Sequence, residues 1–119
     1  MLSLGADEDV LGAAGGDLLV GASAVPLLPG AAELTEAGYV SGGTRNNISY
    51  LAPWTSIDTG VAEPVAVLLQ DAQTSGGLLL STPSPDTLRR ELERRGVLAA
   101  IVGHVTAGFP GRIEVRPGM

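Results

Sequence analysis

Apolar positions along the chain fall into short blocks, and several of these blocks have the pattern of β-strands. Residues 17–22, "DLLVGA", and residues 76–82, "GGLLLST", are apolar runs of strand length between glycine-rich or polar stretches. Residues 97–105, "VLAAIVGHV", form a third run, and residues 112–115, "RIEV", follow it after the turn "TAGFPG". We therefore predict four strands, the last two joined by a short turn.

Helical patterns occupy the intervals between these runs. The clearest begins after Ser84, where Pro85 and Asp86 suit the start of a helix, and it ends at Gly96 after two arginines. Four weaker patterns predict short helices over residues 1–14, 30–37, 44–51 and 63–70, with Thr44 as the N-cap of the third. Mixed strands and helices of this kind favour an α+β or α/β sandwich with a mixed sheet.

Composition narrows the function more than it narrows the fold. The 119 residues correspond to one domain, and a net charge of −6 argues against non-specific nucleic-acid binding. All seven basic residues are arginines, so a P-loop lysine and a Schiff-base lysine are excluded, and the absence of cysteine excludes thiolate metal sites and disulfides. No run of transmembrane length and no signal-peptide pattern is present, which predicts a cytoplasmic protein without a membrane partner.

The proportion of charged residues is low for an independent domain. Charged residues make up 17% of the chain and hydrophobic residues 45%, whereas soluble domains usually carry about a quarter charged residues. A compact apolar domain is one explanation. The other, which we favour, is that part of the apolar surface packs against a partner, including further copies of the chain in a homo-oligomer.

Two glycine-containing stretches are candidate sites. In "SGGTRNN", Gly43, Thr44 and Arg45 lie at a predicted helix start, where backbone N–H groups, the helix dipole and a guanidinium can hold an anion. An ordinary capped helix after a glycine turn explains the same residues.

The second stretch, "DAQTSGG", precedes a predicted strand and so lacks the helix dipole of nucleotide-binding glycine loops. A structural turn is its simpler interpretation, and a ligand-binding loop is the alternative. Its candidate residues are Gln73, Thr74, Ser75, Gly76 and Gly77.

No constellation in the sequence indicates a catalytic centre or a metal site. His104 is the one histidine and has no second ligand at a suggestive spacing, and the acidic cluster Asp7 to Asp9 has the character of a solvated face. No catalytic residue and no metal ligand is therefore assigned from the residues.

Five segments taken together resemble a known family. "VPLLPGAAELTEAG", "GGTRNN", "APW", "DAQTSGGLLLS" and "GHVTAGFPGRIEV" occur in this order, and they resemble the C-terminal half of selenophosphate synthetase, or selenide, water dikinase. The resemblance covers nearly the whole chain, with "QTSGGLL" as its most specific part. It implies a three-layer α/β/α domain with a mixed sheet, as in the C-terminal domains of aminoimidazole ribonucleotide synthetase-related proteins.

The resemblance also implies what this chain lacks. Enzymes of the family convert ATP, selenide and water to selenophosphate, AMP and phosphate, using an N-terminal half with a cysteine or selenocysteine, a lysine and magnesium-binding aspartates. None of these features is matched here, and Asp9 does not fit the aspartate motif. We therefore expect residues 1–119 to be a C-terminal domain that packs on an N-terminal ATP-binding domain, holds no cofactor of its own and is inactive alone. The alternative is a stand-alone binding module of the same fold.

Overall fold

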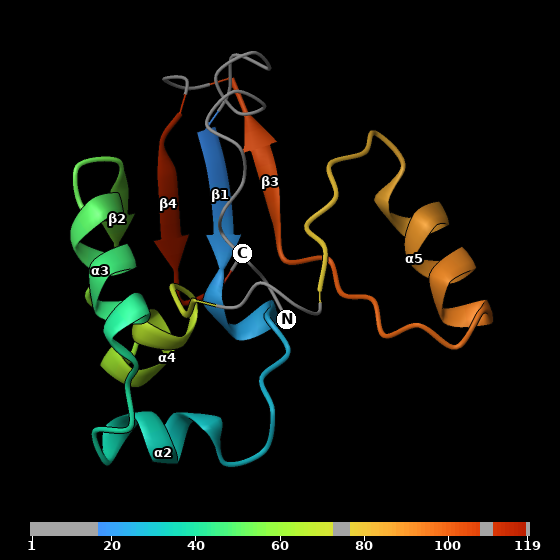
Figure 1. Cartoon of the computed structure of the whole chain (residues 1–119). Coiled ribbons are helices and arrows are strands. Elements are labelled where there is room, and N and C mark those ends of the chain that lie inside the picture. Colours follow the sequence, from blue (N-terminus) through green and yellow to red (C-terminus); the bar gives the residue numbers. More distant parts are fainter. Residues whose placement is uncertain (1–16, 73–76, 108–110, 119) are drawn as a thin grey trace.

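The computed structural model describes residues 17–72, 77–107 and 111–118, and it contains one four-stranded mixed sheet. Its strands are β1 (Asp17–Gly21), β2 (Thr55–Ile57), β3 (Gly103–Thr106) and β4 (Ile113–Arg116), in the order β2-β4-β1-β3. Strands β1, β4 and β2 run parallel, and β3 pairs antiparallel with β1 at one edge (Figure 1).

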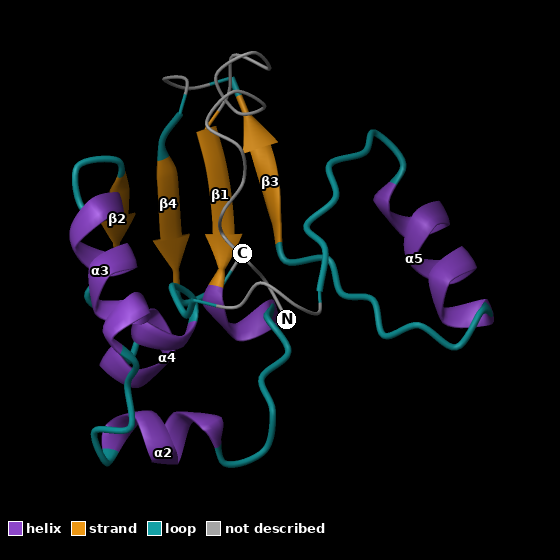
Figure 2. Ribbon diagram, viewed as in Figure 1, coloured by secondary structure: helices purple, strands orange, loops and turns teal. Residues whose placement is uncertain are grey.

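Short helices connect the strands (Figure 2). They are the 3-10 helix η1 (Ala22–Ala24), α2 (Ala31–Glu36), α3 (Gly42–Leu51), α4 (Glu63–Leu68) and α5 (Pro85–Arg94). The predicted α+β class with a mixed sheet is confirmed, and the arrangement is compatible with a three-layer α/β/α fold. None of these helices combines the length and apolar character needed to cross a membrane.

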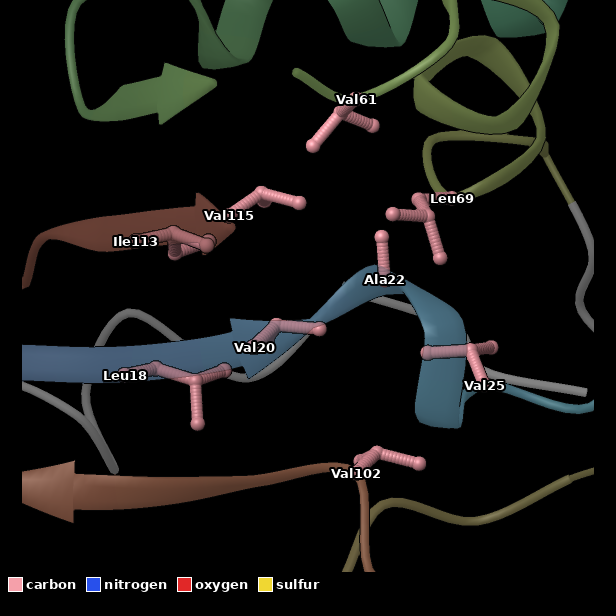
Figure 3. Packing of buried hydrophobic residues seen from close by; sticks show 9 residues of the cluster. All are labelled: Leu18, Val20, Ala22, Val25, Val61, Leu69, Val102, Ile113 and Val115. Carbon is pink, nitrogen blue, oxygen red and sulfur yellow. The ribbon is translucent and has the colours of Figure 1, made fainter. Parts of the chain in front are cut away.

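One face of the sheet carries the core. Alternation along β1 and β4 places Leu18 beside Ile113 and Val20 beside Val115 on the same face, because successive side chains of a strand point to opposite sides. Val61 and Leu69, which flank α4, pack against this face together with residues of η1 and its surroundings (Figure 3). The full buried cluster is Leu18, Val20, Ala22, Val25, Val61, Leu69, Val102, Ile113 and Val115.

The opposite face of the sheet is mostly polar and less buried than the core face. The register aligns Ser56, Glu114, Leu19 and His104 across the four strands, and only Leu19 in this row is apolar. Glu114 forms a salt bridge with Arg116 at 2.8 Å on this face. The burial difference between the two faces is clearest in β4, where the buried Ile113 and Val115 alternate with Glu114, whereas β1 is apolar on both faces at Leu18, Leu19 and Val20.

The predicted strands at residues 17–22 and 112–115 are confirmed, but the other two predictions need correction. Of residues 97–105, only those from Gly103 belong to β3, and the described part of 76–82 forms no strand. Residues 77–82 pair with none of the four strands, although β2 and β3 are edge strands, so an apolar run of strand length does not by itself form a strand. The last two strands are also not neighbours, since β1 lies between them. Strand β2 was not predicted, because three residues are too few to show a period.

The helix predictions hold in the described residues, with one correction at α3. Thr44 is not the N-cap: Ser41 occupies that position, and its hydroxyl accepts from the Thr44 N–H at 3.2 Å. The helix predicted at residues 1–14 lies outside the described residues. Gly96 ends α5 with a φ of 76°, and the following N–H, of Val97, bonds back to the Leu92 carbonyl at 3.0 Å.

Candidate functional site

The two candidate stretches of the sequence meet in the structure. Thr44, in the first turn of α3, is only 1% exposed, and its hydroxyl donates to Asp71 Oδ1 at 2.5 Å. The Thr44 hydroxyl oxygen also accepts a hydrogen bond from the backbone N–H of Ala72 at 3.3 Å. Because Thr44 has a single hydroxyl proton, the Ser41 hydroxyl at 2.9 Å must be a donor to it. The start of α3 is thus bonded to the chain that follows α4.

A second set of contacts reinforces this attachment one turn further along α3. The Asn47 amide donates to the Gln70 carbonyl at 3.1 Å, and the buried Gln70 side chain donates to the Ala66 carbonyl at 3.0 Å. Gly43 lies so close that a Cβ there would stand 3.0 Å from the Ala72 Cβ. We call these contacts the α3 clasp, formed by Ser41, Gly43, Thr44 and Asn47 with Gln70, Asp71 and Ala72.

The α3 clasp joins Gly43 and Thr44, two of the predicted site residues, to Asp71 and Ala72, and it gives Thr44 a different role from the predicted one. Its hydroxyl is bonded within the protein, so the side chain is placed to fix the geometry of the region. Arg45, next to it, is exposed and has no carboxylate partner among the described residues. Gly77 is exposed and lies in no helix or strand, while Gln73 to Gly76 lie outside the described residues.

The chemistry available at this region is that of anion contact. The first turn of α3 provides the positive end of a helix dipole, and Arg45 adds a guanidinium with five donors. No group of three His, Asp or Glu side chains able to hold a metal ion occurs within residues 17–72, 77–107 and 111–118. His104 is exposed on the polar face of the sheet, and Asp7 to Asp9 lie outside the described residues.

The candidate residues named from the sequence include only Gly43 and Thr44 of the clasp. Its other five members, which were not named, are Ser41, Asn47, Gln70, Asp71 and Ala72. Thr44 and Asp71 are 27 residues apart, and no local pattern predicts a hydrogen bond over that separation. The available signal was the polar pair Gln70–Asp71 directly after the apolar helix α4, because a buried polar side chain at such a point needs a partner elsewhere.

We expect Thr44→Val to destabilise the domain by about 1–3 kcal/mol, because it leaves Asp71 and the Ala72 N–H without their hydroxyl partner. The measurement is the midpoint of urea unfolding. The matched control is Thr87→Val, since Thr87 is also the third residue of a ten-residue helix but is exposed. Equal midpoints for the two variants would mean that the clasp contributes nothing to stability.

Comparison with known proteins finds selenide, water dikinases among the relatives of this chain. No protein-family model matches the chain. A selenide, water dikinase of Myxococcus xanthus is 40% identical over 89 residues, which is 73% of this chain and 25% of the relative. Those of Carboxydothermus hydrogenoformans and Nitratidesulfovibrio vulgaris are 38% and 33% identical over 77% and 90% of this chain.

The match extends over most of this chain but over a minor part of each relative. The chain spans 27% of the Carboxydothermus protein and 31% of the Nitratidesulfovibrio protein, a share that fits one domain of a longer enzyme. The mixed sheet with its α3 clasp belongs to a domain of the selenide, water dikinase (selenophosphate synthetase) family.

Proposed function

We propose that this chain acts as the C-terminal domain of a selenophosphate synthetase, packing on an ATP-binding N-terminal half and helping to close the ATP site. The observation that carries the proposal is the identity of up to 40% with selenide, water dikinases over about a quarter to a third of their length. The reaction of the complete enzyme is the conversion of ATP, selenide and water to selenophosphate, AMP and phosphate, a step of selenium metabolism.

The chain's own contribution would be positional and electrostatic. The α3 clasp would hold the first turn of α3 and residues Asp71 and Ala72 in a fixed relation, and Arg45 would face a phosphate group of ATP. Phosphoryl transfer depends on cations that neutralise developing charge and on magnesium ions that bridge phosphates. The described residues offer the cationic part through Arg45 but no set of carboxylates for Mg²⁺. The metal would accordingly be held by the N-terminal half.

The test is complementation in trans. The purified chain is assayed for AMP release from ATP, selenide and magnesium, alone and after mixing with the N-terminal half of the Myxococcus xanthus relative. We expect no selenide-dependent AMP from the chain alone and clear release from the mixture, well above that of the N-terminal half by itself. Selenide-dependent turnover by the chain alone would contradict the assignment of the catalytic residues to the other half.

Arg45→Ala is expected to lower the restored rate a few-fold, because one charge-assisted contact to a phosphate group is lost. The control is Arg116→Ala, whose guanidinium is paired with Glu114 on the less buried face of the sheet. If the two substitutions lower the restored rate equally, Arg45 does not contact a phosphate group of ATP. If mixing restores nothing although the two pieces co-sediment, a stand-alone binding module of the same fold becomes the better description.

A further inference from the structure

Strand β3 has backbone groups that face away from the sheet. It is an edge strand in the order β2-β4-β1-β3. The Gly21 N–H bonds to the Val102 carbonyl at 2.8 Å, and the register from that pair assigns His104, two residues on, to the bonds with β1. The N–H and C=O of the intervening Val105 therefore point to the free edge, where no strand follows in the described part of the chain. Such an edge can accept a further strand.

Residues 77–82 have the properties of a strand without a partner. They are an apolar run of strand length, and none of them forms a backbone–backbone hydrogen bond with another described residue. Leu79 packs against the buried cluster, whereas Leu78 and Leu80 on either side are 82% and 54% exposed. This alternation is that of an extended segment with one face turned toward the core.

The connection from this segment to β3 suits a parallel pair of strands. Parallel neighbours need a crossover connection, which is usually a helix, and α5 lies between residues 77–82 and β3 in the sequence. Figure 1 shows α5 and both of its flanking segments beyond the β3 edge of the sheet, on the side where a strand next to β3 would lie. Residues 77–106 thus have the order and the placement of a strand–helix–strand unit in which the strands are not yet paired.

The handedness of crossovers decides which face of the sheet α5 would cover. Between β1 and β2 the chain passes through α2 and α3, and both belong to the layer of α4 on the core face, since α2 packs against α4 and α3 is bonded to the end of α4. A crossover from residues 77–82 to β3 steps across the sheet in the same direction, but its strands run opposite to β1 and β2. Because such crossovers are right-handed as a rule, this reversal places α5 on the other face.

The side chains available on that less buried face suit the leucine side of α5. Leu19 lies there already, and Leu78 and Leu80 would join it as the residues of the new strand that point away from the core. Leu88 and Leu92 lie one turn apart on α5 and are partly exposed. Helix α5 belongs to none of the closely packed element pairs, so its leucine side is free to cover this face.

We propose that residues 77–102 close onto the sheet, with residues 77–82 as a fifth strand parallel to β3 and the leucine side of α5 over the less buried face. The occupant of the β3 edge is the chain's own segment because the segment is tethered to β3 through α5 and Leu79 already contacts the core. A short tether gives an effective concentration on the order of millimolar, above that of a separate molecule in solution. Closure completes the third layer of an α/β/α fold, and this inference is independent of the proposed enzymatic role.

Disulfide formation tests the closed arrangement, because the chain has no cysteine and every thiol is then an introduced one. Val105→Cys is combined with Leu79→Cys or with Ser81→Cys, which share the core side of the new strand and cover two successive registers. We expect an intramolecular disulfide in one of these two variants under mild oxidation. The matched control is Val105→Cys with Leu80→Cys, whose thiols lie on opposite faces. Linkage no greater than in this control, or linkage only between chains, overturns the proposal.

Amide hydrogen exchange gives a second measure that does not depend on thiols. In the closed arrangement the Val105 N–H is bonded to residues 77–82. The double variant Leu78→Asp, Leu80→Asp should therefore speed its exchange about ten-fold or more, because closure would bury two carboxylates. Exchange at His104, which is bonded to β1, should stay the same.

Equal exchange rates of the Val105 amide in the original chain and in the double variant overturn the closure. Protection of this amide that arises only when the N-terminal half of the Myxococcus xanthus relative is added also overturns it, since the partner would then occupy the edge. No activity is measured in either experiment, so failure here leaves the assignment to selenophosphate synthesis unaffected.

Discussion

Gly103→Ala is expected to destabilise the domain by about 3 kcal/mol or more, because strand β3 has no space for a side chain at this position. A Cβ on Gly103 would stand 1.9 Å from the Leu19 carbonyl oxygen and 3.1 Å from the Val20 Cα. Both are backbone atoms of the central strand β1, so no side-chain rotation can relieve the clash. The measurement is urea unfolding followed by circular dichroism, in which the transition of the variant should move to much lower urea.

The control for this substitution is Gly42→Ala in α3. No atom outside the immediate surroundings lies within 4 Å of a Cβ at Gly42, and the residue is already helical. Alanine there should leave stability unchanged or raise it by about 0.4–1 kcal/mol, since it restricts the unfolded chain. If Gly103→Ala unfolds at the same urea concentration as Gly42→Ala, β3 does not approach β1 as closely as the structure has it.

Val20→Asp is expected to lower the free energy of unfolding by several kcal/mol, which is a large part of the total for a domain of this size. Val20 has no exposed surface and lies beside Val115 at the centre of the buried cluster. A carboxylate there loses its hydration without gaining a partner. Burial raises the pKa of such a carboxyl above its value in the unfolded chain. The loss of stability in the variant should therefore become smaller as the pH falls and the group becomes protonated.

The neighbouring substitution Leu19→Asp is the matched control for this prediction. Leu19 precedes Val20 in the same strand but points to the polar face, where it lies between Glu114 and His104. We expect its cost to be about 1 kcal/mol, typical of a partly exposed position. Urea midpoints measured at pH 7 compare the two variants, and similar losses for both would contradict the assignment of a single buried face.

Local sequence signals determined the elements whose ends or faces are encoded within a few residues. Helix α5 has a proline and an aspartate at its start and a glycine at its end, and the structure places it at Pro85–Arg94 as predicted. Strands β1 and β4 were predicted from short apolar runs bounded by polar or glycine residues, and both are present, at Asp17–Gly21 and Ile113–Arg116. The glycine and arginine of the "GGTRNN" segment likewise indicated that a helix starts nearby.

Tertiary structure decided what depends on partners far apart in the sequence. Strand β1 lies between β3 and β4, although β3 and β4 follow each other in the sequence. The short segment that connects β3 and β4 does not predict this strand order. The run "GGLLLST" has the composition of a strand, yet its described residues have no neighbouring strand to bond. The partner of Thr44 is Asp71, which only the packing of α3 against the end of α4 brings within reach. Side-chain periodicity and helix caps are determined by residues within a few positions of one another. Strand order and buried hydrogen bonds instead depend on which groups, far apart in the sequence, come together in the folded core.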